Sequence, residues 1–251
     1  MTAGRVRALL LDLDGTLLIN DMEIFGRQYF RLLLDKFRHL CPSNLFAESL
    51  DIATSAMAHN DGSKGTNAEV FWAEFLPRVG RQPEELMPLF DDFYAHDFET
   101  LRDCTARDPD ARVLVKLAFE RGYQVAIATQ PMFPIAANLA RLRWAGVGAD
   151  EFQYDFIASY EATRACKPHP HYFAELLEHL RRAPQECLMV GDSLEADMPA
   201  RRLGLKTFWV DRARAGRAPG RMFDARGGLG DLVQLIQTGR IDALRRHGEA
   251  N

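Results

Sequence analysis

Hydrophobic residues follow two different patterns along this chain. Residues 20–105 carry them at the three- and four-residue spacing of amphipathic helices, whereas residues 1–19 and 106–251 alternate short apolar runs with helical stretches. Apolar runs without polar alternation are typical of parallel strands that are buried on both faces. The pattern therefore predicts an α/β fold, a doubly wound parallel sheet, whose strands cover residues 6–11, 125–129, 156–158, 187–190 and 206–210.

Helices are expected between these strands and after the last one. The helix that begins at Pro134 is expected to turn Ile135, Leu139 and Leu142 toward the sheet, because these residues share one face. The other helices of this part are expected over residues 113–121, 168–180, 194–204 and 229–236.

The purely helical part interrupts the α/β pattern after the first strand. One expected helix carries an apolar face formed by Phe30, Leu33, Leu34, Phe37 and Leu40. We expect Phe71, Trp72 and Phe75, on a second helix, to pack inside the helical bundle. The chain is therefore predicted to form a core domain from residues 1–19 and 106–251, with an inserted helical domain formed by residues 20–105.

The composition excludes two classes of protein. The formal net charge is −4 over 251 residues, which does not suit a nucleic-acid-binding protein. The first apolar run is broken by Asp12 and Asp14, unlike a signal peptide or a membrane span. Four scattered cysteines without metal-ligand spacing fit a reducing compartment. We therefore expect a cytoplasmic protein with no nucleic-acid or membrane partner, and the sequence leaves its oligomeric state open.

Polar residues that can carry chemistry follow directly after the expected strands. Asp12 and Asp14 end the first strand, and two such carboxylates are costly there without a cation or a shared proton. A polar turn around Gly15 is the alternative interpretation of this segment. Because ligands gather at the carboxyl ends of parallel strands, the remaining strands decide between the two interpretations.

Each of the next three strands is also followed by such a residue. Thr129 and Gln130 follow the second strand, Lys167 is expected to open the helix after the third, and Asp192 follows the fourth. Each has a structural explanation of its own, such as a helix cap for Thr129 or a solvated side chain for Lys167. Their joint placement at the strand ends favours one shared site.

These segments, in this order, resemble the four motifs of the haloacid dehalogenase superfamily. Asp12-Leu13-Asp14-Gly15-Thr16 is similar to the first motif and Thr129 to the second. Lys167-Pro168 is similar to the third, and Gly191-Asp192 together with Asp197 to the fourth. The resemblance covers essentially the whole chain. It implies a Rossmann-like core and a helical cap inserted between the first two motifs.

The resemblance also implies a role for each motif residue. Asp12 would be the nucleophile and Asp14 the general acid and base. Mg²⁺ would be held by the carboxylates of Asp12 and Asp192 and by the backbone carbonyl of Asp14. Thr129 and Lys167 would bind the phosphate, as would Gln130, which replaces the asparagine common in relatives. Ser193 and Asp197 would orient Lys167 and the metal ligands.

The implied activity is hydrolysis of a small phosphorylated metabolite by a Mg²⁺-dependent phosphatase through an aspartyl-phosphate. A phosphomutase, a haloacid dehalogenase and a binding or regulatory protein on the same fold are the alternatives. Asp14 disfavours the dehalogenase, because a halide leaves without protonation. Substrate identity stays open.

Two basic segments outside the motifs have less specific interpretations. Lys64, in the glycine-containing loop 60–66, is a candidate contact for an anionic substrate, and an exposed turn is the alternative. The cluster of Arg212, Arg214, Arg217 and Arg221, interleaved with glycine and proline, is expected to be a solvated loop.

Overall fold

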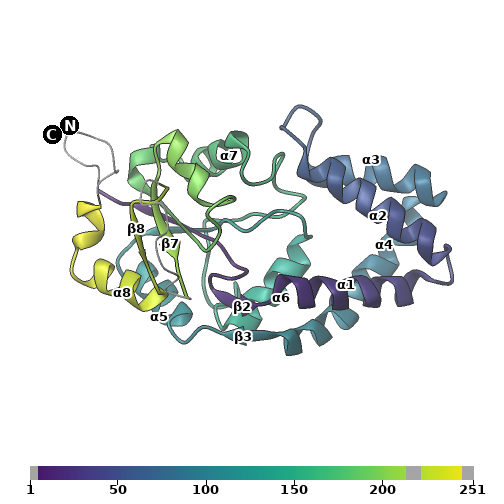
Figure 1. Cartoon of the computed structure of the whole chain (residues 1–251), viewed down its shortest axis with the longest axis horizontal. Coiled ribbons are helices and arrows are strands. Elements are labelled where there is room, and N and C mark those ends of the chain that lie inside the picture. Colours follow the sequence, from purple (N-terminus) through teal and green to yellow (C-terminus); the bar gives the residue numbers. More distant parts are fainter. Residues whose placement is uncertain (1–4, 213–221, 245–251) are drawn as a thin grey trace.

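A computed structural model describes residues 5–212 and 222–244 and contains a six-stranded parallel sheet (Figure 1). The strand order is β5-β4-β1-β6-β7-β8, and each neighbouring pair runs parallel. The predicted parallel sheet is therefore confirmed. Its strands are β1 (Ala8–Leu11), β4 (Gln124–Ile127), β5 (Phe156–Ile157), β6 (Cys187–Gly191), β7 (Lys206–Val210) and β8 (Ala225–Gly227).

Helices cover both faces of the sheet, as alternate residues of β1 show. Leu9 and Leu11 pack in one hydrophobic cluster with residues of α5, α6 and α8. Ala8 and Leu10 point the other way, into a second cluster with α7. Successive strand residues face opposite sides, so a fully apolar strand needs both layers. The covering helices are α5 (Ala111–Glu120), α6 (Ile135–Ala145), α7 (Pro170–Leu180) and α8 (Leu229–Gln237), with the short η3 (Pro184–Glu186), η4 (Met198–Leu203) and η5 (Arg240–Ala243).

Three elements differ from the sequence predictions. The helix expected from residue 168 begins at Pro170, so Lys167 lies in the loop before α7 and does not open the helix. A turn and the six-residue 3₁₀ helix η4 replace the helix expected over residues 194–204. β8 was missed because its three residues are partly exposed and form no apolar run.

The buried face of α6 also differs from the prediction. Ile135 is 37% exposed, whereas Asn138 and Arg141 are completely buried. Of the predicted face, Leu142 is completely buried and Leu139 is partly buried, so the prediction fails at Ile135, and the rest of the buried face is made largely of small and polar side chains. An arginine on such a face needs partners from another segment of the chain.

Residues between β1 and α5 form the second part of the molecule, at the right in Figure 1. Its two ends pair as the antiparallel strands β2 (Leu18–Asn20) and β3 (Thr105–Arg107). Phe30, expected on the buried face of α1, is 43% exposed. The helices are α1 (Met22–Phe37), α2 (Ser43–Ala58), α3 (Asn67–Val79), α4 (Pro83–Asp92), η1 (Phe93–Asp97) and η2 (Phe98–Cys104).

Polar contacts tie this helical part to the sheet part. The Asn67 side chain donates hydrogen bonds to the Thr163 hydroxyl and to the Ala165 carbonyl, both at 3.1 Å. Glu99 accepts a hydrogen bond from the Trp144 indole at 2.8 Å. All four cysteines are free thiols. None of the helices in residues 5–212 and 222–244 has the length and apolar character needed to cross a membrane.

Candidate active site

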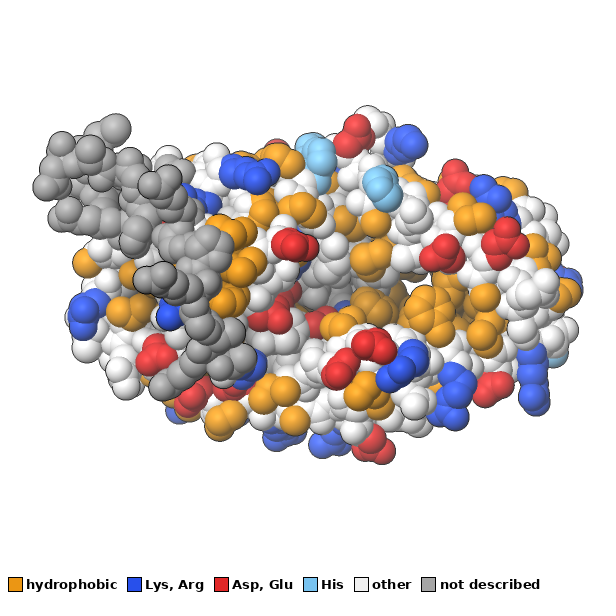
Figure 2. Space-filling view, in the orientation of Figure 1, with side chains coloured by type: hydrophobic (Ala, Val, Ile, Leu, Met, Phe, Trp, Pro, Cys, Tyr) orange, Lys and Arg blue, Asp and Glu red, His pale blue; other side chains and the backbone are white. Residues whose placement is uncertain are grey.

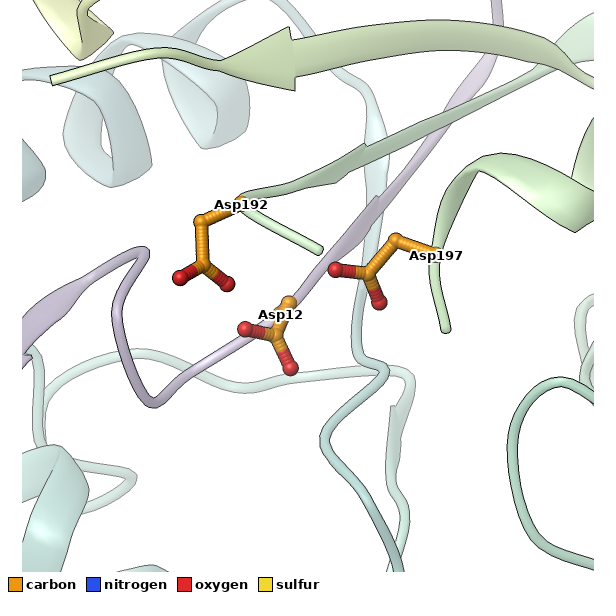
Figure 3. A group of neighbouring side chains, drawn as sticks. All are labelled: Asp12, Asp192 and Asp197. Carbon is orange, nitrogen blue, oxygen red and sulfur yellow. The ribbon is translucent and has the colours of Figure 1, made fainter. Parts of the chain in front are cut away.

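Three carboxylates meet where β1 and β6 end. Asp12 follows β1, Asp192 follows β6, and Asp197 lies in the turn after Asp192. One carboxylate oxygen from each lies within 4.8 Å of the other two (Figure 3). The parallel order of β1 and β6 brings these residues together from distant places in the sequence.

Lys167 joins two of these carboxylates. Its Nζ donates to Asp12 Oδ1 at 2.8 Å and to Asp197 Oδ1 at 2.6 Å. Gln130 holds the backbone of Lys167 from both sides, since its Oε1 accepts from Lys167 N at 2.8 Å and its Nε2 donates to Lys167 O at 3.1 Å. Both polar ends of the Gln130 side chain are therefore used in fixing Lys167.

Burial dominates the electrostatics of this group. It raises the pKa of Asp12 to about 7, with Lys167 acting in the opposite direction. It raises the pKa of the buried Asp197 as well, and partial desolvation together with the charge of Asp12 raises the pKa of Asp192, which is more exposed to solvent, to about 6. Burial works against the charge of Lys167, but Asp12 and Asp197 outweigh it, so the pKa of Lys167 is raised. The Lys167 ammonium therefore stays charged. Its single positive charge does not fully offset the effect of burial on the carboxylates, so their pKa values stay raised.

The donor set fits a divalent cation. When Asp12, Asp192 and Asp197 are ionised, Lys167 neutralises one of three negative charges and two remain. Carboxylate oxygens are the ligands that Mg²⁺ and other hard divalent cations prefer. The turn that carries this group is also tight, because a Cβ on Gly15 (φ 75°) would overlap the Asp192 carboxylate. The described residues are therefore compatible with a divalent metal at this position.

A buried hydroxyl beside this group has no partner. Thr129 follows β4 and is completely buried, and its Oγ1 makes no hydrogen bond to any atom of residues 5–212 and 222–244. Buried polar atoms are almost always satisfied, so an unsatisfied one requires an explanation. This hydroxyl can bind a ligand oxygen without first breaking an existing bond.

Asp14, two residues beyond Asp12, is held by residues that sequence reasoning missed. Its Oδ1 accepts a hydrogen bond from Asn20 Nδ2 at 2.8 Å, and its Oδ2 forms an ion pair with Arg141. The guanidinium of Arg141 also donates to Asn138 Oδ1 and lies over the ring of Phe133, 4.4 Å from its centroid. The sequence did offer one sign of Arg141, because it is a charged residue among the small apolar residues of the helix expected after Pro134.

The other two residues predicted for the site, Ser193 and Lys64, lie in different environments. Ser193 donates its backbone N–H to Asp197 Oδ2 at 3.0 Å, and so fixes the carboxylate that binds Lys167. Lys64 is exposed in its loop. That loop is anchored by Asn60, which donates to the Gly65 carbonyl and to Asn67 Oδ1, each at 3.0 Å.

Arg212 departs from the expectation of a solvated side chain. It donates to the backbone carbonyls of Gly15 and Thr16 and forms an ion pair with Asp108. It therefore supports the turn that carries Asp14 and was missed because its partners lie far away in the sequence. Arg214, Arg217 and Arg221 lie outside the described residues.

Comparisons with known proteins identify relatives along nearly the whole chain. A family model described as haloacid dehalogenase-like hydrolase matches residues 6–203. The pyrophosphatase PpaX of Bacillus cereus is 27% identical over 218 residues, 85% of this chain and 87% of that protein. A phosphoserine phosphatase of Thermus thermophilus is 28% identical over 257 residues, 92% of this chain and 98% of that protein.

Solved structures show the same fold. A 2-haloacid dehalogenase from Pseudomonas syringae superposes with a TM-score of 0.62 at 19% identity, covering 93% of this chain and 99% of its own. A shared fold does not fix a reaction, so the reaction has to be argued from the side chains.

Proposed function

Because this chain belongs to the haloacid dehalogenase-like hydrolase family, we propose that it is a Mg²⁺-dependent phosphatase that hydrolyses small phosphate monoesters. The observation that carries this proposal is the buried group of Asp12, Lys167 and Asp197, with Asp14 two residues beyond Asp12. The phosphoserine phosphatase relative, named for a phosphate monoester, supports this reaction, and the pyrophosphatase relative supports transfer of a phosphoryl group to water more generally.

The first step is attack by a carboxylate oxygen of Asp12 on phosphorus. A bond forms between this oxygen and phosphorus while the bond from phosphorus to the ester oxygen breaks. Asp14 gives a proton to the departing oxygen, and the alcohol leaves. In the second step a water molecule transfers a proton to Asp14, and its oxygen bonds to phosphorus while the bond from phosphorus to Asp12 breaks, which releases phosphate and restores the Asp12 carboxylate.

The other residues stabilise the negative charge on the phosphoryl oxygens during both steps. Lys167 holds Asp12 in place and neutralises a phosphoryl oxygen, and the free hydroxyl of Thr129 donates to another. Mg²⁺, bound by Asp12, Asp192 and the Asp14 carbonyl, would supply positive charge to the phosphoryl group. Gln130 and Ser193 are positioning residues, since Gln130 fixes the Lys167 backbone and Ser193 fixes Asp197.

The helical part, residues 20–105, acts in this proposal as a cap over the strand ends. Lys64 is proposed only as a contact for an anionic substrate group. The dehalogenase alternative does not use Asp14, whose carboxylate is held by two polar partners here.

A substrate panel tests the proposed function. Phosphate release from small phosphate monoesters should require Mg²⁺ and disappear with EDTA. Halide release from a haloacid would favour the dehalogenase, and an isomerised phosphate ester without free phosphate would favour the mutase. The absence of free phosphate, halide and isomerised ester would favour a binding protein.

A further inference from the structure

An apolar cavity lies between the helical part and the sheet part. Its volume is about 200 Å³, and its walls come from α1, α2, α3 and the end of α4 on one side. Residues 132–134 and Tyr160, from loops after β4 and β5, close the other side. Figure 2 shows a hollow between the two parts with hydrophobic side chains around its rim.

Aromatic rings form much of the wall of this cavity. Phe71 and Trp72 of α3, expected to pack inside the helical bundle, line it together with Phe133 and Tyr160. Phe75, by contrast, is completely buried and does not line the cavity. Phe71 is buried and stacks on Phe75 as expected, but it and Trp72 also border the cavity, because the facing wall belongs to the other part of the chain.

None of the described residues that line the cavity carries a charge. Two of its polar groups, the hydroxyls of Tyr29 and Tyr94, are hydrogen-bonded to each other at 2.7 Å. Burial raises the pKa of Tyr29 to about 12, so this hydroxyl is neutral at physiological pH. A phosphate dianion has no cationic partner among these lining residues, whereas an apolar ring has an aromatic wall to pack against.

Two contacts connect the cavity wall to Asp14. Phe133 lines the cavity and lies under the Arg141 guanidinium that pairs with Asp14. Met22 also lines it, and its sulfur accepts a hydrogen bond at 3.3 Å from the Asn20 amide that donates to Asp14. A single side chain, that of Arg141 or of Asn20, therefore links the cavity wall to Asp14, which in the proposed reaction protonates the departing alcohol.

We propose that this cavity binds the alcohol part of the substrate, and that the preferred substrates are phosphate monoesters of compact aromatic alcohols. The inference rests on the proposed function, because it places the phosphate at Asp12 and the ester oxygen at Asp14. The size is suitable, since a cavity of roughly 150 Å³ accommodates a benzene ring. A polar alcohol would face a wall that is mostly aromatic and offers its polar groups only a few hydroxyl partners.

The test compares benzyl phosphate, ethyl phosphate and phosphoethanolamine, all esters of primary alcohols. With Mg²⁺ present, kcat/KM for benzyl phosphate should exceed that for ethyl phosphate by about tenfold or more. Phosphoethanolamine should be the poorest substrate of the three. Equal kcat/KM values for benzyl and ethyl phosphate would overturn the proposal.

Variants of the cavity wall make the test specific. Thr54, half-buried on α2, lines the cavity, and its neighbour Ser55 is exposed. Thr54→Gln should reduce the preference for benzyl over ethyl phosphate by about tenfold. Ser55→Gln, which adds the same side chain to the same helix, should leave the preference unchanged. Trp72→Ala should reduce it as well, whereas the wild-type preference in both Thr54→Gln and Trp72→Ala would overturn the proposal.

A binding measurement separates this inference from the proposed function. Calorimetry with benzylphosphonate and ethylphosphonate, which cannot be hydrolysed at the P–C bond, should show about tenfold tighter binding of the former. Hydrolysis of all esters with no aromatic preference in either measurement would reject the inference and keep the phosphatase. Tighter benzylphosphonate binding that Thr54→Gln weakens, without hydrolysis of any ester, would uphold the cavity and reject the phosphatase.

Discussion

The guanidinium of Arg141, completely buried on α6, is ion-paired with the carboxylate of Asp14. The contact joins two segments 127 residues apart in the sequence. Arg141 also donates to Asn138 on its own helix. The position of Asp14 is therefore fixed by α6 as well as by its own turn.

Removing Arg141 should destabilise the protein through Asp14. Arg141→Leu would leave a partly buried carboxylate without its partner, and we expect a loss of about 3 kcal/mol in the free energy of unfolding. Adding Asp14→Asn should recover part of that loss, because the uncompensated charge is removed. Urea unfolding of the two single variants and the double variant measures this coupling, and additivity within about 0.5 kcal/mol would contradict it.

Thr129→Val should separate catalysis from stability. The hydroxyl has no partner in the described structure, so an isosteric methyl group should leave the free energy of unfolding unchanged or raise it slightly. We expect kcat/KM to fall about 100-fold, because a donor to the phosphoryl group is lost. Urea unfolding and steady-state kinetics on the same preparation check both. A large loss of stability with unchanged kcat/KM would show that the hydroxyl is structural.

Asp14→Asn should affect substrates according to their leaving groups. For an alkyl phosphate, whose alkoxide needs a proton, we expect turnover to fall at least about 100-fold. For nitrophenyl phosphate the first step should survive and the second should slow, giving a burst of nitrophenol equal to the enzyme concentration. Stopped-flow absorbance detects the burst. Equal losses for both substrates without a burst would show that Asp14 has only a structural role.

Stability should depend on pH through Asp12 and Asp192. Their folded pKa values, about 7 and about 6, are above the ordinary value of 3.8, so the folded protein binds more protons than the unfolded one between these values. Without metal, these groups should make the protein less stable as pH rises from about 4 to about 7. Mg²⁺ favours the ionised carboxylates, so it should raise Tm more at about pH 8 than at about pH 5.

Thermal unfolding with Mg²⁺ or EDTA at both pH values measures this difference. The difference in Tm between Mg²⁺ and EDTA at one pH removes the contribution of titrating groups that do not interact with the metal. Asp192→Asn should reduce the effect of Mg²⁺ at both pH values. An Mg²⁺-induced rise in Tm that is the same at the two pH values would contradict the charge balance described for the site.

The sequence predicted the parts of the site that depend on strand order. Asp12, Thr129 and Asp192 each follow an apolar run, and parallel pairing of β1 with β4 and β6 brings such positions together. Arg141 could not be found in this way, because its partner Asp14 is a contact between distant segments. Its helix also buries polar residues, so hydrophobic spacing indicated Ile135 instead.

The helical part shows the same limit. The spacing of apolar residues identified its helices, but it does not distinguish a residue packed inside the bundle from one facing another part of the chain. Phe75 and Trp72 illustrate this, since Phe75 is completely buried and Trp72 lines a cavity closed by Phe133. The short strands β2 and β3 were missed because three residues each give too little pattern.

The central claim is that Asp12 forms a covalent bond to the phosphoryl group, and acid-quenched mass spectrometry tests it most directly. Asp14→Asn protein mixed with nitrophenyl phosphate and Mg²⁺ should carry one phosphoryl group on the peptide that contains Asp12. The adduct should appear with the nitrophenol burst and be missing in the Asp12→Asn variant. Full turnover by Asp12→Asn, or hydrolysis with no adduct on this peptide at any time, would contradict the account.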